Sequence, residues 1–232
     1  MPIPERFEDR EQAAELLARR LAAYAGRADV TVIGLPRGGV PVAAVIAARL
    51  QVALDILLVR KLGVPGQPEL AFGAVASGGL CVLQPDTVAA LHISRRTIGA
   101  VARREMAEIE RREALYGVVN TQLARPSLHG RVLIIVDDGI ATGATMRAAI
   151  EALRQTRPAR VMVAVPVGPH DTCAALRAEV DELVCLNTPP RFFAVGQWYR
   201  HFDQVGDDQV RALLEAARCR QAMPADAPRQ QA

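Results

Sequence analysis

Residues 132–145 read Val-Leu-Ile-Ile-Val-Asp-Asp-Gly-Ile-Ala-Thr-Gly-Ala-Thr, and this stretch decides the fold. Its first five residues are apolar and mostly β-branched, which is typical of a strand buried on both faces of a parallel sheet. Asp137 and Asp138 follow where such a strand ends, and small and hydroxyl residues continue from Ala141 to Thr145. A strand, a tight loop and a helix N-terminus in this order predict a phosphate cradle, because free backbone N–H groups and the helix dipole both favour an anion.

The same segment resembles the signature of the type I phosphoribosyltransferases, which bind 5-phosphoribosyl-1-diphosphate (PRPP). The resemblance is unbroken over residues 132–145 and includes the acidic pair. It implies that Asp137 and Asp138 hold the ribose hydroxyls and bind Mg²⁺, directly or through water. It also implies that the 5′-phosphate is bound by the residues of the next loop, which are Ala141, Thr142, Gly143, Ala144 and Thr145.

Length and composition bound the fold class. The chain has 232 residues, enough for one sizeable α/β domain, and it is 50% hydrophobic with only 4% aromatic residues. Its core is therefore expected to consist of Ala, Val, Leu and Ile. The order of strand, loop, helix and strand recurs along the chain, which predicts a doubly wound, mainly parallel sheet flanked by helices, with a small C-terminal hood.

The chain is expected to form one phosphoribosyltransferase-like domain followed by a tail. We expect this domain at residues 1–218, with a core at about 28–186 and a hood made of about 187–205 plus the N-terminal helix. Pro, Gln and Ala dominate residues 219–232, which predicts a disordered tail.

Periodicity and turn residues predict the individual elements. In chain order these are a helix at 8–24, a strand at 30–34, a helix at 40–50, a strand at 54–59, a mobile loop at 61–69, a hairpin of 71–76 with 80–83, and a charged helical segment at 86–116. Ile98, Val101, Ile109 and Leu115 form a candidate apolar seam along the charged segment.

The segment after the first strand resembles the diphosphate loop of the same family. Residues 35–40 read Leu-Pro-Arg-Gly-Gly-Val, and Gly38 and Gly39 permit backbone geometry that a side chain would block. The resemblance implies that this loop binds pyrophosphate, with Arg37 as a charged donor. An ordinary strand-to-helix turn is the alternative for the loop taken alone.

Arg60 and Lys61 follow the second expected strand, and we expect them at the same edge of the sheet. The resemblance places basic residues here that reach the diphosphate. Because positioned cations stabilise the negative charge that grows on the leaving diphosphate, Arg60 and Lys61 are the expected catalytic residues. Mg²⁺ that bridges ribose and diphosphate oxygens would act in the same way. Two solvated bases at a strand end are the alternative.

The resemblance also implies a reaction, in which a nitrogenous acceptor, expected to be a nucleobase, displaces pyrophosphate from PRPP. Members that act on 6-oxopurines carry an Asp in the phosphate loop, where this chain has Ala141. This difference argues against a 6-oxopurine acceptor and resembles the adenine and uracil members. A homodimer is common in the family.

Residues 187–205 hold most of the late aromatic side chains and are the expected base-binding hood. We expect Phe193, Val195, Trp198 and Tyr199 to contact a planar base. Packing of these aromatic residues onto the core is an equal alternative. The order Phe-x-Ala-Val-Gly-x-Trp-Tyr in this segment resembles an uncharacterised bacterial subgroup of the family.

Charge and cysteine pattern argue against other functional classes. The formal net charge of +3 is too small to indicate a nucleic acid partner, and the four cysteines are scattered without a Cys-x-x-Cys pair. No apolar run approaches the roughly 20 residues that cross a bilayer, so we expect a cytoplasmic protein with no membrane partner. A non-catalytic regulatory protein that binds PRPP or a nucleotide is the alternative to the enzyme.

Overall fold

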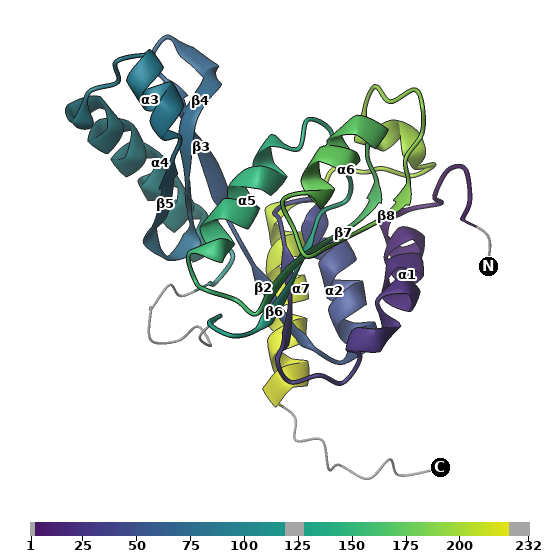
Figure 1. Ribbon diagram of the computed structural model, residues 1–232. Coiled ribbons are helices and arrows are strands. Elements are labelled where there is room, and N and C mark those ends of the chain that lie inside the picture. The colour runs from purple at the N-terminus through teal and green to yellow at the C-terminus, as the bar shows by residue number, and fades with distance from the viewer. Residues whose placement is uncertain (1–2, 119–127, 223–232) are drawn as a thin grey trace, which may run out of the picture.

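The computed structural model describes residues 3–118 and 128–222 and contains two β-sheets (Figure 1). The larger sheet has five strands in the order β2-β1-β6-β7-β8, and the smaller has three in the order β3-β4-β5. The strands are β1 (Val30–Gly34), β2 (Ala53–Ile56), β3 (Val59–Val64), β4 (Gln67–Ala76), β5 (Leu80–Leu83), β6 (Val132–Val136), β7 (Arg160–Val167) and β8 (Glu182–Asn187). The helices are α1 (Arg10–Arg20), α2 (Gly39–Leu50), α3 (Pro85–Ala90), α4 (Arg95–Leu115), α5 (Ala144–Arg154), α6 (His170–Arg177) and α7 (Asp207–Ala222).

The five-stranded sheet is parallel throughout and is covered by helices on both faces. Successive residues of a strand point to opposite faces, and the apolar strands supply both. Val32 and Ile134 pack in one buried cluster with residues of α1 and α2. Ile33 and Ile135 pack in another, with residues of α5 and α6. The expected doubly wound, mainly parallel sheet flanked by helices is therefore confirmed.

The strand order places a topological switch point between β1 and β6. From β1 the chain moves through α2 to β2 on one side, and from β6 it moves through α5 to β7 on the other side. The helices that follow β1 and β6 therefore run to opposite sides from a switch point at the carboxyl ends of these two strands, which is where doubly wound folds form a crevice. Ligands of open α/β sheets bind in such a crevice.

The second sheet was not anticipated, and it corrects two predictions. The strand expected at 54–59 ends at Ile56, and the mobile loop expected at 61–69 is instead the hairpin of β3 with β4. The chain leaves the main sheet because the Leu57 amide makes its last bond to Gly34, whereas the Leu58 amide donates to the Ser77 hydroxyl at 3.1 Å. The hairpin expected from 71–76 and 80–83 is present as β4 and β5.

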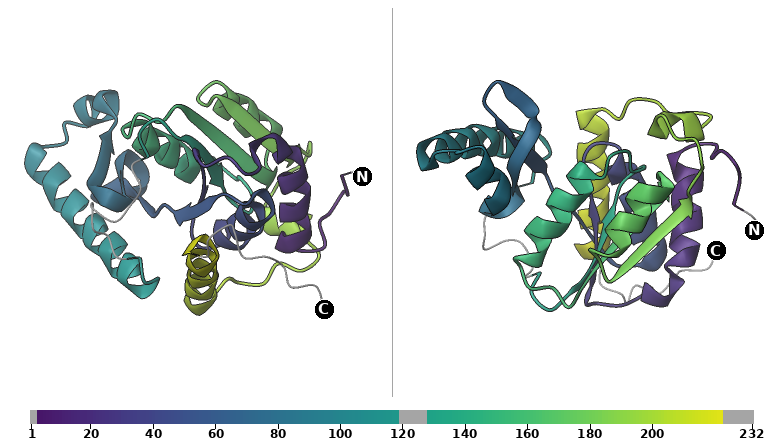
Figure 2. Two further views of the ribbon diagram at one scale, coloured as in Figure 1. Left: turned by 90° about the horizontal axis from the view of Figure 1, so that it is seen from below. Right: turned by 45° about the horizontal axis from the view of Figure 1, so that its top comes forward.

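The three-stranded sheet forms a separate lobe with α3 and α4, beside α5 (Figure 2). The charged segment 86–116 is thus two helices. Val101 and Ile109 of the expected seam are buried, whereas Leu115 is 40% exposed. Glu105 is buried on the same helix, so the lobe interior carries a charge that helical periodicity alone did not indicate.

The chain ends of the described part pack against the core. α7 extends to Ala222, which makes residues 219–222 helical rather than a disordered tail, while 223–232 lie outside the described residues. Val210 and Leu214 bury the inner face of α7. No helix among the described residues is both long enough and apolar enough to cross a membrane.

Candidate functional site

Asp137 and Asp138 lie at the switch point, directly after β6. This strand is buried along its whole length between β1 and β7, so its end is fixed at the centre of the sheet edge. The Asp137 carboxylate accepts a hydrogen bond from the Asp138 amide at 2.9 Å. The acidic pair therefore lies at the carboxyl end of a buried parallel strand, as the sequence predicted.

The loop after β1 closes tightly over the acidic pair. A Cβ atom on Gly38 would lie 2.0 Å from an Asp138 carboxylate oxygen, and one on Gly39 would lie 2.5 Å from the Val136 carbonyl oxygen. No real Cβ approaches another atom so closely, so the two glycines are needed for the contact between the two loops. Both loops expected to bind PRPP thus meet at one place.

The Asp138 residue is held by two long-range partners. The Arg10 Nε donates to its Oδ2 at 2.9 Å, and Arg10 Nη2 lies 2.8 Å from the same oxygen. The Tyr199 hydroxyl donates to the Asp138 backbone carbonyl at 2.6 Å. The carboxylate and the backbone of this residue are therefore both fixed before any ligand binds.

The acidic pair is electrostatically strained by its burial. Burial raises the pKa of Asp137 well above its usual range, and the neighbouring negative charge of Asp138 raises it further. Burial also raises the pKa of Asp138, while the Arg10 guanidinium acts in the opposite direction. Two close carboxylates with a single guanidinium beside them favour the binding of a further cation or of hydroxyl donors.

The loop from Ala141 to Thr145 forms the N-terminus of α5. Gly143 has φ +77°, a left-handed conformation, and directly precedes the helix. The first N–H groups of a helix have no partner within the helix, so the start of α5 can bind an anion. The Ala144 amide makes a long hydrogen bond, of 3.4 Å, to the Thr142 hydroxyl oxygen. Thr142 and Thr145 are exposed and add hydroxyl groups, and Ala144 begins the helix.

A cavity of about 340 Å³ lies beside the acidic pair. Its wall comes from four separate regions of the chain, namely α1, the loop after β1, the loop after β6 and the segment before α7. The lining residues are Arg10, Arg37, Gly38, Asp138, Phe202, Asp203, Gln204 and Val205. Arg37, expected to bind pyrophosphate, therefore faces the same space as Asp138.

The acidic pair fits Mg²⁺ that arrives with a ligand. No cluster of three or more His, Cys, Asp or Glu side chains in residues 3–118 and 128–222 could hold a metal ion by itself. Mg²⁺ keeps several waters and commonly binds through one or two carboxylates plus substrate phosphates. Asp137 and Asp138 supply this hard oxygen donor set, because their buried negative charge is only partly neutralised.

Comparison with known proteins decides the family. Residues 5–200 match the family model described as phosphoribosyl transferase domain. The chain belongs to the phosphoribosyltransferase family.

Two candidate phosphoribosyl transferases of Mycobacterium tuberculosis, strains CDC 1551 / Oshkosh and H37Rv, are each 50% identical to this chain over 211 residues. The match covers 91% of this chain and 47% of each relative, so the chain spans about half the length of these curated relatives. The crystal structure of TT1426 from Thermus thermophilus superposes with a TM-score of 0.80 at 42% identity, covering 90% of this chain and 97% of that chain.

Arg60 and Lys61 do not lie where the sequence of this chain predicted. They belong to β3 in the small lobe and not to the carboxyl edge of the parallel sheet. The Arg60 guanidinium lies 2.7 Å from the buried Glu105 of α4, so its charge is largely used inside the lobe. Lys61 is exposed.

The four residues expected in the base-binding hood have different environments. Phe193 is 86% exposed, and Tyr199 is buried between Phe7 and Phe202 with ring centroids at 5.6 and 4.9 Å. Tyr199 thus has no open face for a base, and its packing onto the core agrees with the alternative interpretation.

The other two hood residues, Val195 and Trp198, have different neighbours. Val195 packs over Gly139, where an added Cβ would lie 2.5 Å from a Val195 methyl group. Trp198 stacks on Phe192 at 6.4 Å between ring centroids. Val195, which packs on Gly139, and Tyr199, whose hydroxyl donates to the Asp138 carbonyl oxygen, are therefore the two hood residues that these contacts bring next to the acidic pair.

Sequence reasoning missed Arg10, Phe202 and Asp203 as parts of this site. Arg10 is separated from Asp138 by 128 positions, and it lies on a helix whose residues resemble any amphipathic surface helix. No motif marks it. Only the fold brings α1 to the carboxyl edge of the sheet.

Proposed function

We propose that this protein is a Mg²⁺-dependent phosphoribosyltransferase that transfers the phosphoribosyl group of PRPP to a nitrogenous acceptor, a nucleobase, with release of pyrophosphate. One observation carries the proposal: the acidic pair, the N-terminus of α5 and the loop containing Gly38 meet at the switch point between β1 and β6. We further expect a homodimer, and sedimentation analysis would test this oligomeric state. We also expect the protein to be cytoplasmic.

The arrangement suits each part of PRPP. The Asp137 and Asp138 carboxylates accept hydrogen bonds from the ribose 2′- and 3′-hydroxyls, since ionised carboxylates are strong acceptors. The 5′-phosphate lies against the amides at the start of α5, with the Thr142 and Thr145 hydroxyls. The diphosphate then extends towards Arg37 and the cavity beside it.

The reaction is a displacement at the anomeric carbon. A nitrogen lone pair of the acceptor forms the bond to C1 as the C1–O bond to the diphosphate breaks, and the electrons of that bond leave with the diphosphate. The nucleobase loses one N–H proton to water or to the departing diphosphate. Positive groups near the diphosphate stabilise this growing charge more than they stabilise bound PRPP, which lowers the barrier. Bound Mg²⁺ supplies additional positive charge at the diphosphate oxygens.

Lys61 is the residue that we propose for the leaving group, with Arg60 as a secondary candidate. Both lie on the small lobe, so the proposal requires that the lobe bring β3 towards the diphosphate when the ligand binds. Because the Arg60 guanidinium already pairs with Glu105 at 2.7 Å, its contribution is expected to be the smaller of the two.

The acceptor is proposed to lie on the side of the site that Val195 and Phe193 border. Val195 packs directly on Gly139 of the ribose loop, and Phe193 presents an exposed ring on the same segment. With Ala141 in the phosphate loop there is no carboxylate to accept a hydrogen bond from a 6-oxopurine. Adenine and uracil are therefore the first acceptors to test.

The experiment measures PRPP binding by calorimetry and pyrophosphate release with a panel of nucleobases, all with Mg²⁺ present. Wild-type protein should bind PRPP and release pyrophosphate with at least one base. Lys61→Ala should lower turnover much more than PRPP affinity, whereas the matched exposed change Arg103→Ala on α4 should alter neither.

The outcomes separate the enzyme from its alternative. Failure of folded wild-type protein to bind PRPP with Mg²⁺ contradicts the whole proposal. PRPP binding without pyrophosphate release across the panel favours the non-catalytic regulatory protein. Equal losses of binding and turnover in Lys61→Ala remove the leaving-group role of this lysine.

A further inference from the structure

The Arg10 side chain reaches the site through several contacts at once. Its Nε and Nη2 atoms lie 2.9 and 2.8 Å from Asp138 Oδ2, and its Nη1 donates to the Asp203 carbonyl oxygen at 2.8 Å. The guanidinium carbon lies 3.9 Å from the centre of the Phe202 ring. These contacts hold the planar group in one orientation on the wall of the cavity.

This orientation leaves part of the guanidinium for a ligand. A guanidinium carries five N–H donors in a rigid fork, and the contacts above use three of them. The other two N–H groups, one on each terminal nitrogen, have no partner within residues 3–118 and 128–222. Because Arg10 lines the cavity, these donors are available to a group that enters it.

The other charges of the cavity indicate the chemistry of that group. Arg37 faces the same space and lies 3.9 Å from Asp207, so it too carries a carboxylate beside it. Because each of the two guanidinium groups has a carboxylate beside it, the wall has no excess positive charge to attract a bare polyanion. It suits a diphosphate whose charge is partly neutralised by a divalent cation, with guanidinium groups on phosphoryl oxygens and carboxylates towards the cation.

We propose that Arg10 is a diphosphate-binding residue, which holds Asp138 with one edge of its guanidinium and donates its two remaining N–H groups to the Mg²⁺-complexed diphosphate with the other. This inference rests on the proposed function, since it names a further residue of the same site. Arg10 would also supply the diphosphate with a cation from the core domain. The charge of Arg60, by contrast, is paired with Glu105 in the lobe.

The test compares three ligands by calorimetry with Mg²⁺ present: PRPP, inorganic diphosphate and ribose 5-phosphate. Ribose 5-phosphate uses the acidic pair and the phosphate loop but has no diphosphate. Arg10→Met should weaken PRPP and diphosphate binding by about tenfold or more, as expected when charge-assisted hydrogen bonds are lost. It should weaken ribose 5-phosphate binding by less than about threefold, because only the support of Asp138 is lost.

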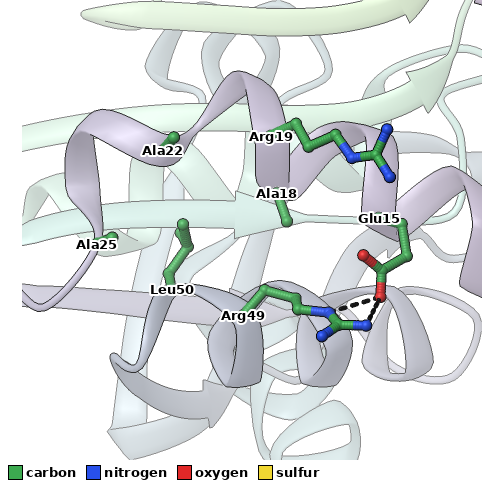
Figure 3. A pocket seen from close by; sticks show the side chains of 7 residues that line it. All are labelled: Glu15, Ala18, Arg19, Ala22, Ala25, Arg49 and Leu50. Atoms are coloured by element: carbon green, nitrogen blue, oxygen red, sulfur yellow. Dashed lines mark hydrogen bonds and ion pairs between the residues drawn. The ribbon is translucent and has the colours of Figure 1, made fainter. Parts of the chain in front are cut away.

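Arg49 of α2 provides a matched control, because its carboxylate partner lies on α1, the helix that carries Arg10. It lies near the C-terminal end of α2, opposite to the site, and pairs with Glu15 of α1 at 2.6 Å beside a cavity of about 430 Å³ (Figure 3). Arg49→Met also removes an arginine–carboxylate pair that involves α1. It should leave the affinity for all three ligands unchanged.

The proposal is decided by comparing how much affinity Arg10→Met loses for diphosphate and for ribose 5-phosphate. If Arg10→Met loses as much affinity for ribose 5-phosphate as for diphosphate, Arg10 acts only by supporting Asp138. If its affinity for diphosphate is unchanged, Arg10 does not contact the diphosphate. Either result overturns the inference while the proposed function stands. Wild-type protein that binds none of the ligands contradicts both. If Arg10→Met fails to fold, Arg10→Lys replaces it, and its retained charge without the planar fork should give a smaller loss confined to PRPP and diphosphate.

Discussion

The Tyr199 hydroxyl donates to the backbone carbonyl oxygen of Asp138 at 2.6 Å and thereby ties the hood to the acidic pair. Burial raises the pKa of Tyr199 far above its usual range, and the negative charge of Asp138 adds to this. Because the pKa of Tyr199 is raised, its hydroxyl remains a protonated donor at neutral pH. A residue expected to stack on a base thus fixes the loop after β6, which we propose binds the ribose.

Tyr199→Phe should loosen this loop. Loss of the hydroxyl leaves a mostly buried carbonyl oxygen without its donor, so the free energy of unfolding should fall by about 1 kcal/mol and PRPP affinity should fall several-fold. Urea denaturation and calorimetry measure the two effects. The control is Tyr24→Phe, which removes a hydroxyl bound to Glu182 on the opposite end of the molecule and should leave PRPP affinity unchanged.

Gly38→Ala should weaken PRPP binding by about tenfold or more through collision with the carboxylate alone. The backbone of Gly38 has φ −63° and ψ −31°, which alanine adopts readily, yet its Cβ would lie 2.0 Å from Asp138 Oδ2. Shifts of this kind in packed regions cost about 1–3 kcal/mol. Calorimetry with PRPP measures the loss.

Gly99→Ala is the matched substitution for comparison. Gly99 lies within α4, where the added methyl group would approach only the flexible end of Arg103, at 3.3 Å. It should raise the free energy of unfolding by about 0.5–1 kcal/mol and leave PRPP affinity unchanged. Comparable loss of affinity in both variants would show that the contact between Gly38 and Asp138 is not the cause.

Asp137→Asn should stabilise the protein at neutral pH while abolishing PRPP binding. Because the pKa of Asp137 is raised in the folded state, its contribution to the free energy of unfolding is fully present only while the carboxyl is protonated. That contribution is lost as pH rises through the folded-state pKa. Replacing the carboxylate at pH 7.5 should therefore raise Tm by about 2–4 °C, the shift that about 1 kcal/mol gives in a domain of this size.

The pH dependence of this stabilisation checks its sign. Below about pH 4 the carboxyl is protonated in both states, so the difference in Tm between wild type and Asp137→Asn should disappear. Asp29→Asn gives the opposite case, because the hydrogen bond from Arg27 lowers the pKa of Asp29. That variant should not be more stable than wild type at pH 7.5, and a stabilisation equal to that of Asp137→Asn would exclude burial as the cause.

Arg60 and Glu105 should show energetic coupling in a double-mutant cycle. Burial alone would raise the pKa of Glu105, but hydrogen bonds from Arg104 and Arg60 lower it. Because the Arg60 side chain is 37% exposed, we expect a coupling of about 1 kcal/mol rather than the larger value of a fully buried pair. Urea denaturation of Arg60→Met, Glu105→Gln and the double variant measures it. The exposed pair of Arg111 with Glu108 should show a smaller coupling, and equal values would argue against a structural role for Arg60 in the lobe.

The local sequence pattern was sufficient to predict where the central residues of the site lie in the fold. The run from Val132 to Val136 can only be a buried parallel strand, so the carboxylates after it must lie at the carboxyl edge of the sheet. The same logic placed Gly38 and Gly39 after β1. It failed at Arg60 and Lys61, since the chain leaves the sheet where Leu58 binds Ser77, and a bond to a residue 19 positions away has no signature in a short apolar strand.

By itself, the sequence determined the central parallel strands β1 and β6 and the residue types of the loops at the switch point, because these depend on periodicity and on backbone freedom over a few residues. The tertiary structure alone decided that Arg10 lies on Asp138 and that Tyr199 supports it. It also decided that Arg60 belongs to a separate lobe. Such contacts join residues far apart in the chain, and they are selected by the packing of whole helices and loops rather than by any pattern near each residue.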